Sequence, residues 1–249
     1  RSVEIAVHNG VHDSNAALYF YRSLGFTDFT LVSTGTWVII FNPASPLERL
    51  DADRDMLANV TVDHQPVATI RFMGGREYDV ASGGWTKPVS AEAVARVIAA
   101  KAFALPSFAP GGPMPGHEGR FVGPAVAGEE RAAVAMLYVA LMTDLSLDLI
   151  GSENAIVIDG GLVKTGLYAS VLAALRPGQT VHTSANPEGS AFGAAALVFD
   201  AIGDNPFVND CAVAEPASIP GLDEYRLQWR HHVDAMASAE AVSREEKRA

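Results

Sequence analysis

The fold prediction starts from two stretches, G-V-H-D-S-N-A-A-L at residues 10–18 and T-L-V-S-T-G-T-W-V-I-I-F at residues 30–41. In the first, an acidic residue, Asp13, stands where an extended segment gives way to a helical pattern. In the second, two apolar, β-branched runs flank Ser-Thr-Gly-Thr at residues 33–36, which predicts a hairpin with a tight turn. Hydroxyls and backbone N–H groups in such a turn, near a carboxylate at a helix start, suit phosphate chemistry.

The composition indicates a compact protein with a sizeable core. Of the 249 residues, 49% are hydrophobic and only 19% are charged, which fits one large or two small domains. The net charge of -11 would repel a phosphate backbone, so nucleic acid is not expected as a partner, although backbone N–H groups can still hold a small anion. The single cysteine, Cys211, excludes an internal disulfide framework and fits a reducing compartment.

The sequence predicts neither a leader nor a membrane span. The first ten residues, R-S-V-E-I-A-V-H-N-G, lack a basic segment followed by an apolar one, and no uninterrupted apolar run reaches membrane-spanning length. We therefore expect a cytoplasmic protein with no membrane partner. The histidines lack metal-ligand spacing such as H-E-x-x-H, so no metal site is assigned.

Hydrophobic periodicity and turn residues predict an alternation of strands and helices. Pro and Gly are too dense at residues 106–128 for a regular element, and residues 74–77 and 82–85 are expected to be loops. The polar segment after Gly203 is expected to contain a surface helix at residues 224–239 and a frayed end. Strands are expected at residues 3–8, 28–34, 37–42, 58–62, 67–72, 155–158 and 180–184, and helices at residues 13–24, 91–102, 129–149, 165–175 and 189–202.

Four motifs follow one another along the chain: G-V-H-D-S-N-A-A-L, S-T-G-T-W-V, I-V-I-D-G-G-L-V-K-T from residue 156, and N-P-E-G-S-A-F-G-A-A-A-L from residue 186. Between the second and the third lie F-A-P-G-G-P-M-P-G and F-V-G-P. Together they resemble the C-terminal half of the FGGY carbohydrate kinases, members of the superfamily of sugar kinases, heat-shock ATPases and actin. The resemblance covers residues 3 to about 202. H-D-S-N-A with S-T-G-T-W looks nearest to the rhamnulokinase and fuculokinase members.

The resemblance implies an α/β domain of the ribonuclease H-like fold, with a mixed five-stranded sheet and helices on both faces. Residues 1–205 would form the C-terminal, nucleotide-binding domain of a sugar kinase, and residues 206–249 an extension that is partly helical or disordered. Family members are about twice as long as this chain. The N-terminal, sugar-binding domain is absent from it, so the chain alone should lack a complete sugar pocket.

The resemblance further implies ATP-dependent phosphorylation of a sugar hydroxyl, on a ketose, deoxyketose or polyol, with ATP and Mg²⁺ as cofactors. Asp13 matches the family's catalytic aspartate, so we expect it to accept the hydroxyl proton, with His12 beside it in contact with the substrate. A carboxylate at a helix start also has a plain structural role, because it can cap the helix. The local sequence alone fits that role just as well.

Two glycine-containing turns are the expected ATP contacts. The turn at residues 33–36 resembles the family's second phosphate loop, and the two glycines after the strand at residues 155–158 resemble its adenosine motif. The structural alternative for the first turn is an ordinary hairpin turn, and for the two glycines it is a tight strand-to-helix connection. For the lysine that follows the glycines, the alternative is a solvated position at a helix start. Gly193 is expected to allow close helix packing rather than to touch adenine. The residues expected to bind ATP are Ser33, Thr34, Gly35, Thr36, Gly160, Gly161 and Lys164.

Other interpretations of the same residues remain open. The chain could be a non-catalytic nucleotide-binding or assembly module of this fold, or a hydrolytic actin-type ATPase. Arg76 and Glu77 either face the cleft or form a local salt bridge. The expected partners are a small-molecule sugar and the missing N-terminal half, and a homodimer is also open. The sequence does not identify which sugar, or which hydroxyl, is phosphorylated.

Overall fold

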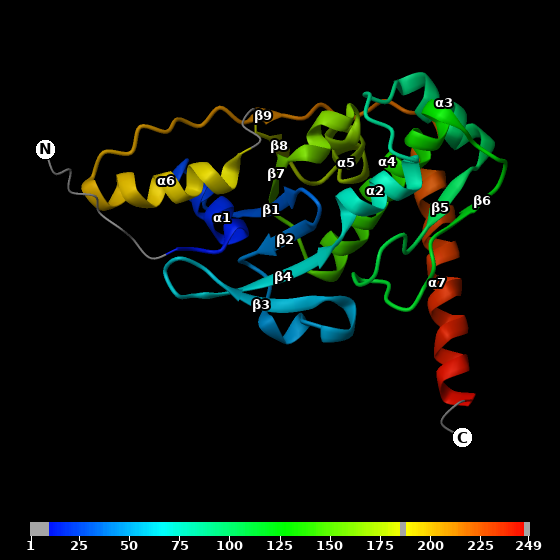
Figure 1. The fold of residues 1–249 in the computed structure, drawn as a ribbon, viewed down its shortest axis with the longest axis horizontal. Helices are drawn as coiled ribbons and strands as arrows, with labels where there is room; N and C mark the ends of the chain where they lie inside the picture. The colour runs from blue at the N-terminus through cyan, green and yellow to red at the C-terminus, as the bar shows by residue number, and fades with distance from the viewer. Residues whose placement is uncertain (1–9, 185–187, 247–249) are drawn as a thin grey trace, which may run out of the picture.

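A mixed sheet of seven strands forms the centre of the computed structural model, which describes residues 10–184 and 188–246 (Figure 1). The strands are β1 (Phe29–Thr34), β2 (Val38–Asn42), β3 (Met56–Val60), β4 (Pro66–Phe72), β7 (Ala155–Gly160), β8 (Val181–Thr183) and β9 (Ala212–Val213). Their order across the sheet is β3-β4-β2-β1-β7-β8-β9. β1 pairs in parallel with β7, and β7 with β8, whereas the other neighbours are antiparallel.

Helices cover both faces of this sheet, as expected. They are α1 (Asp13–Ser23), α2 (Gly74–Ser82), α3 (Ala91–Ala100), α4 (Gly128–Leu149), α5 (Tyr168–Leu175), α6 (Gly189–Ile202) and α7 (Leu222–Glu246), with short 3-10 helices η1 (Leu47–Arg49), η2 (Ala52–Arg54) and η3 (Gly161–Thr165). α1 and α6 lie together at one end of the molecule, and α2, α3, α4 and α7 lie at the other (Figure 1). A second, two-stranded sheet joins β5 (Phe103–Leu105) to β6 (Arg120–Val122).

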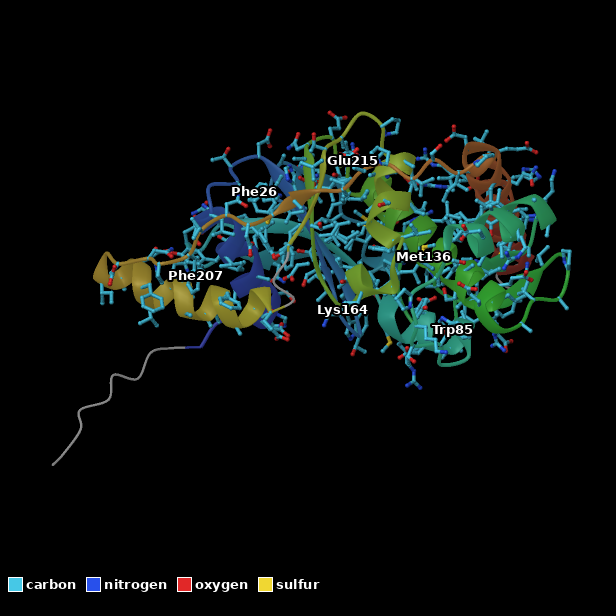
Figure 2. All side chains as sticks on the ribbon, turned by 90° about the horizontal axis from the view of Figure 1, so that it is seen from above. Phe26, Trp85, Met136, Lys164, Phe207 and Glu215 are labelled. Atoms are coloured by element: carbon cyan, nitrogen blue, oxygen red, sulfur yellow. The ribbon has the colours of Figure 1, made fainter. Side chains whose placement is uncertain are left out.

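The alternation of side chains along β1 explains why both faces are covered. Phe29 and Leu31 join α1 and α6 in a smaller hydrophobic cluster, whereas Val32 joins the larger cluster that α4 and α5 complete. Phe207 packs against the smaller cluster and Met136 belongs to the larger one, and the two lie far apart along the molecule in Figure 2. The sheet therefore separates two apolar layers.

The long helix α4 is apolar on most faces because the fold encloses it. Residues 132–147 are all buried. By length and composition α4 could cross a membrane, but 89% of its most apolar window is buried inside the protein. Such burial is that of a core helix, which is what the sequence predicts for residues 129–149.

Three expectations about elements are wrong. Residues 106–128 do contain a regular element, because Arg120–Val122 form β6, which pairs with β5. Residues 74–77 are not a loop, because they form the first turn of α2. Two consecutive glycines disfavour a helix intrinsically, but tertiary packing decides here. The sheet has seven strands instead of five, and one of them, β9, is only two residues long, too short for any periodic pattern to predict. The strand expected at residues 3–8 lies outside the described residues.

The helix expected on the surface at residues 224–239 is longer and partly internal. Trp229 of α7 is fully buried, and its Nε1 donates a hydrogen bond to the carbonyl oxygen of Ala104 at 2.9 Å. Leu227, by contrast, is exposed. α7 therefore presents one face to the core and one to solvent.

Gly193 has the packing role that the sequence predicts. A Cβ atom at this position of α6 would overlap the backbone of Ala16 in α1. The two helices can therefore approach closely only because residue 193 has no side chain. This contact fixes the start of α1, where Asp13 lies, against the rest of the layer.

Candidate functional site

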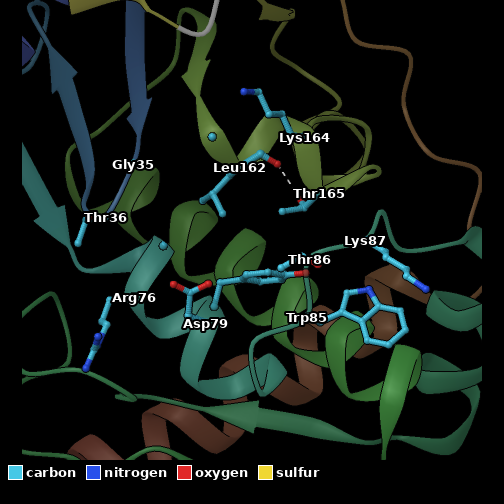
Figure 3. A pocket seen from close by; sticks show the side chains of 13 residues that line it. Gly35, Thr36, Arg76, Asp79, Trp85, Thr86, Lys87, Leu162, Lys164 and Thr165 are labelled. Atoms are coloured by element: carbon cyan, nitrogen blue, oxygen red, sulfur yellow. Dashed lines mark hydrogen bonds between the residues drawn. The ribbon is translucent and has the colours of Figure 1, made fainter.

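A cavity of about 470 Å³ opens beside the carboxyl ends of β1 and β7 (Figure 3). Its volume lies within the range of small-molecule sites. The walls come from the turn after β1, from α2 and the loop that follows it, and from η3. The lining residues are Gly35, Thr36, Gly75, Arg76, Tyr78, Asp79, Trp85, Thr86, Lys87, Gly161, Leu162, Lys164 and Thr165.

The turn after β1 packs tightly against the start of α2. A Cβ atom at Gly75 would overlap the carbonyl oxygen of Gly35, so only glycine allows the helix to come this close. The backbone N–H of Arg76 then donates to the carbonyl oxygen of Thr36 at 3.3 Å. The second glycine of M-G-G-R-E, Gly75, therefore forms part of one wall of the cavity.

The end of β7 is held to β1 by the Thr34 side chain. Its Oγ1 donates to the carbonyl oxygen of Asp159 at 2.6 Å and accepts from the backbone N–H of Leu162 at 3.1 Å. Gly160 has a φ of 94°, and a Cβ atom there would overlap the carbonyl oxygen of Thr34. These contacts fix Gly161 at the edge of the cavity.

The structure therefore brings four of the seven expected ATP-binding residues to the cavity wall. These are Gly35, Thr36, Gly161 and Lys164. The other three lie behind it in the sheet: Ser33 pairs with Ile39 in β2, Thr34 is buried, and Gly160 pairs with Thr34. The hydroxyl of Thr34 is already occupied on both sides, so its place in the site is to shape the wall.

Positive charge predominates around the cavity. Arg76, Lys87 and Lys164 line it, and Asp79 is the acidic residue among the lining residues. This local excess stands out in a chain with a net charge of -11. Glycine backbone beside several cations suits an anionic ligand such as a polyphosphate.

Sequence reasoning missed the part of the cavity that follows α2. Trp85, Thr86 and Lys87 line it, although residues 82–85 were expected only to connect other elements. A usable signal was present, because Ser82-Gly83-Gly84 predicts a sharp reversal that exposes the residue after it. An aromatic residue directly after such a reversal is a candidate ligand contact.

Asp13 and His12 lie outside the lining of this cavity. Their side chains are 75% and 62% exposed, and Nδ1 of His12 is 2.9 Å from Oδ1 of Asp13. His12 is the N-cap of α1, whereas Asp13 is the first helical residue and accepts from the backbone N–H of Ser14 at 2.7 Å. The carboxylate thus has a local structural contact, and most of its surface is open to solvent.

Arg76 and Glu77 point to different environments. Arg76 lines the cavity, but Glu77, the next residue of the same helix, is only 1% exposed and is turned about 100° away from Arg76. Its Oε2 accepts from the backbone N–H of Phe108 at 3.1 Å and from the Tyr138 hydroxyl. Burial raises the pKa of Glu77 to about 7, although both donors act in the opposite direction.

A second buried carboxyl group, that of Asp159, precedes the two glycines at the end of β7. It is 3% exposed, and burial raises its pKa to about 6, with a lowering effect from Tyr21. A Cβ atom at Gly189 would overlap its Oδ2, so the first turn of α6 lies against this carboxyl. Asp159 therefore ties α6 to the strand that ends at the cavity.

Metal binding by protein side chains finds no support in the described residues. In that part of the chain, no group of three or more His, Cys, Asp or Glu side chains could hold a metal ion. The lining residues nevertheless fit the phosphates of ATP, because they offer cations and, at Gly35 and Gly161, glycine positions with open space around them. A magnesium ion at such phosphates would take its ligands from them and from water.

Comparison with known proteins gives one family. Residues 26–206 match the model of "Carbohydrate kinase FGGY, C-terminal domain". The chain belongs to the FGGY carbohydrate kinase family. No curated protein sequence matches it significantly. Within this family, the closer similarity of the chain to the rhamnulokinase and fuculokinase members stays a prediction.

Solved structures agree with this assignment. A carbohydrate kinase from Novosphingobium aromaticivorans is 35% identical over 91% of this chain, with a TM-score of 0.76. Xylulose kinase from Rhodospirillum rubrum, 17% identical over 93% of the chain, and glycerol kinase with ADP from Plasmodium falciparum, 14% identical over 93%, share the fold with TM-scores of 0.63 and 0.56. The FGGY domain thus has the ribonuclease H-like fold of these kinases. It spans 51%, 51% and 50% of those three chains.

Proposed function

We propose that this FGGY domain is the nucleotide-binding half of an ATP-dependent kinase that phosphorylates a hydroxyl group of a sugar or polyol. The observation that carries the proposal is the cavity at the ends of β1 and β7, which glycine backbone and three cationic residues line. Phosphoryl transfer depends mostly on positioning and on stabilising charge on the transferred group. In this cavity the glycine backbone would position the phosphates, and the cationic side chains would stabilise the charge on the transferred group.

In this proposal the phosphates of ATP lie along Gly35, Thr36 and Gly161. Glycine backbone allows the phosphate oxygens to approach N–H groups, and the Thr36 hydroxyl adds a donor. Arg76 and Lys164 offset the negative charge of the phosphates. Magnesium, when bound with ATP, adds further charge neutralisation at the same oxygens.

Asp13 is the proposed acceptor of the substrate's hydroxyl proton. Its position in H-D-S-N-A matches the family's catalytic aspartate, and its 75% exposure leaves the carboxylate accessible to a substrate held by another domain. His12, beside it, is proposed to touch that substrate. Since Asp13 lies outside the cavity lining, catalysis would require the domain to close against an N-terminal half.

The substrate class is proposed from the family and from the chain's length. The relatives are carbohydrate, xylulose and glycerol kinases by name, and this chain covers only about half of each. Most contacts that select a ketose, deoxyketose or polyol are therefore assigned to the other half. The missing half is the proposed partner, and a cytoplasmic location is proposed with it.

Nucleotide binding is tested first on the 249-residue chain by isothermal titration with ATP and ADP. The expected result is saturable binding that Arg76→Ala weakens. A panel of sugars is then assayed on the longer protein that carries both halves, and one or more should be phosphorylated. ATP binding without any sugar phosphorylation would support the alternative function, a non-catalytic nucleotide-binding module. ATP turnover that needs no sugar would identify a hydrolytic ATPase. Absence of ATP binding would overturn the proposal.

A further inference from the structure

The cavity has two chemically different ends. Gly35 and Thr36 lie at one end, whereas Trp85 and Lys87 lie at the other (Figure 3). The first end offers small residues and backbone polar groups, and the second offers a large aromatic surface. A ligand that extends from one end to the other would therefore need a charged portion and a flat, apolar portion.

Trp85 is held in place from both sides of its loop. Gly83 and Gly84 have φ values of 72° and 77°, which reverse the chain after α2. The backbone N–H of Trp85 donates to Oγ of Ser82 at 3.2 Å. Further along, the backbone N–H of Val89 donates to the carbonyl oxygen of Thr165 at 3.1 Å, which ties the loop to η3. The ring is thus fixed before any ligand binds.

The Trp85 ring combines packing with an open surface. It packs partly against the larger hydrophobic cluster and also lines the cavity. Its Nε1 is buried and has no hydrogen-bond partner among the described residues, so packing rather than a hydrogen bond holds the ring. The Lys87 ammonium lies 6.0 Å from the ring centroid, at the outer limit of a cation–π contact. Such a distant contact leaves the ring available to a stronger partner.

We propose that Trp85 is the platform on which the base of the bound nucleotide stacks, and that it makes this site selective for purine over pyrimidine nucleotides. The inference rests on the proposed nucleotide site, and it adds the position and class of the base. With the phosphates at Gly35, Thr36 and Gly161, the base points toward the opposite end. Stacking grows with ring overlap, so a two-ring purine gains more from the indole than a one-ring pyrimidine.

The magnitude of the effect follows from stacking energies of bases on aromatic side chains. Removing such a platform weakens binding between about 5-fold and 150-fold. The loss applies only to ligands that carry a base. Binding of inorganic tripolyphosphate, which occupies only the phosphate end, should not change.

The test measures dissociation constants of ATP, CTP and tripolyphosphate for the 249-residue chain and for Trp85→Ala, Trp85→Phe and Trp37→Phe. Because Nε1 of Trp85 has no partner, Trp85→Phe removes stacking area without removing a hydrogen bond. Trp37 is the matched control, because its ring lies outside the cavity lining and carries Arg71, whose Cζ is 5.1 Å from the ring centroid. Tryptophan fluorescence of each variant reports which ring meets the base.

The expected result has four parts. The wild-type chain binds ATP more tightly than CTP. Trp85→Ala loses this preference together with at least about 5-fold in ATP affinity, and Trp85→Phe lies between the two. Tripolyphosphate binding is the same in all variants. ATP should quench the fluorescence of the wild type and of Trp37→Phe, but not of Trp85→Phe.

The outcomes separate this inference from the proposed function. If the wild type binds ATP and Trp85→Ala binds it equally well, the stacking platform is overturned and the nucleotide site stands. If Trp85→Ala loses tripolyphosphate along with ATP, Trp85 only maintains the cavity, and the platform is again overturned. If the wild type binds neither ATP nor tripolyphosphate, the nucleotide site fails and the platform with it.

Discussion

Two acidic side chains, Asp13 and Glu77, show how burial decides what a carboxyl group can do in this domain. Asp13 is 75% exposed at the start of α1, whereas Glu77 is 1% exposed on the buried side of α2. The exposed group is free to meet a substrate. The buried one is restricted to the neighbours that hold it.

The first prediction concerns Asp13. In the longer protein that carries both halves, Asp13→Asn should reduce sugar phosphorylation by at least about 100-fold, because an amide cannot accept the hydroxyl proton. ATP affinity should stay within about twofold, since Asp13 lies outside the cavity lining. Asp53→Asn is a matched control, because Asp53 is also an exposed acid in the first turn of a short helix, η2. Substantial turnover by Asp13→Asn would remove Asp13 from the mechanism.

The second prediction concerns the pH dependence of stability at Glu77. Burial raises its pKa from 4.5 to about 7, so the folded state holds a proton that the unfolded chain releases above pH 4.5. The free energy of unfolding should therefore fall as pH rises from about 4.5 to 7, by at most about 3 kcal/mol. Asp159, with a pKa of about 6, titrates in the lower part of this window, so the range from pH 6 to 7 reports mainly on Glu77.

Urea unfolding between pH 5 and 8 measures this effect. Glu77→Gln should flatten the curve between pH 6 and 7, because the amide does not titrate. Tyr138→Phe removes a donor that lowers the pKa of Glu77, so it should move the fall in stability to higher pH. An unchanged slope in Glu77→Gln would assign the pH dependence to other groups.

At the scale of elements, α7 is attached to the core by ionic as well as apolar contacts. Asp144 of α4 is fully buried among three arginines: Nε of Arg176 is 2.8 Å from Oδ1, and Nε of Arg226 and Nη2 of Arg230 are 2.9 and 2.5 Å from Oδ2. Asp148, one turn later, is 45% exposed and meets Arg176 and Arg230. Two helices and the end of α5 therefore meet at one carboxylate.

The third prediction is that Asp144→Asn lowers the free energy of unfolding by about 3–5 kcal/mol, because it leaves buried guanidinium groups without a counter-charge. Asp148→Asn, at a more exposed carboxylate in the same cluster, should cost about 1 kcal/mol or less. Urea unfolding of both variants at pH 8 gives the comparison. Equal losses would mean that burial of Asp144 adds nothing to the ion pairs.

The elements also show what the sequence could and could not predict. The runs of β1, β2 and α4 were predictable, because burial along most of each element appears in the sequence as a continuous apolar run. α2 was not, because Gly74 and Gly75 disfavour a helix, and only tertiary packing requires them: Gly75 approaches Gly35, and Gly74 lies against Val38 and Phe72. The same limit applies to the cavity: the four motifs contain the lining residues Gly35, Thr36, Gly161 and Lys164, whereas Trp85 lines it from a loop outside those motifs.

At the scale of the whole molecule, the FGGY family model and the folded unit end at different places. The model match stops at residue 206, yet α7 begins at Leu222 and buries Trp229, Tyr225 and Val233 in the larger cluster. Tyr225 also donates from its hydroxyl to the carbonyl oxygen of Ala102 at 2.6 Å. We therefore propose that the segment after residue 206 belongs to the same cooperative domain, although the expected boundary at residue 205 separates it.

The fourth prediction tests this by truncation. A chain ending at Gly221 loses the buried face of α7 and two of the three arginines around Asp144, so it should melt at least about 10 °C lower or fail to unfold cooperatively. A chain ending at Ser238 keeps Trp229, Val233 and Met236, and it should melt within a few degrees of the full chain. Near-ultraviolet circular dichroism and calorimetry measure both. If the chain ending at Gly221 melts like the full chain, α7 is a separate appendage, and the core of the domain is complete without it.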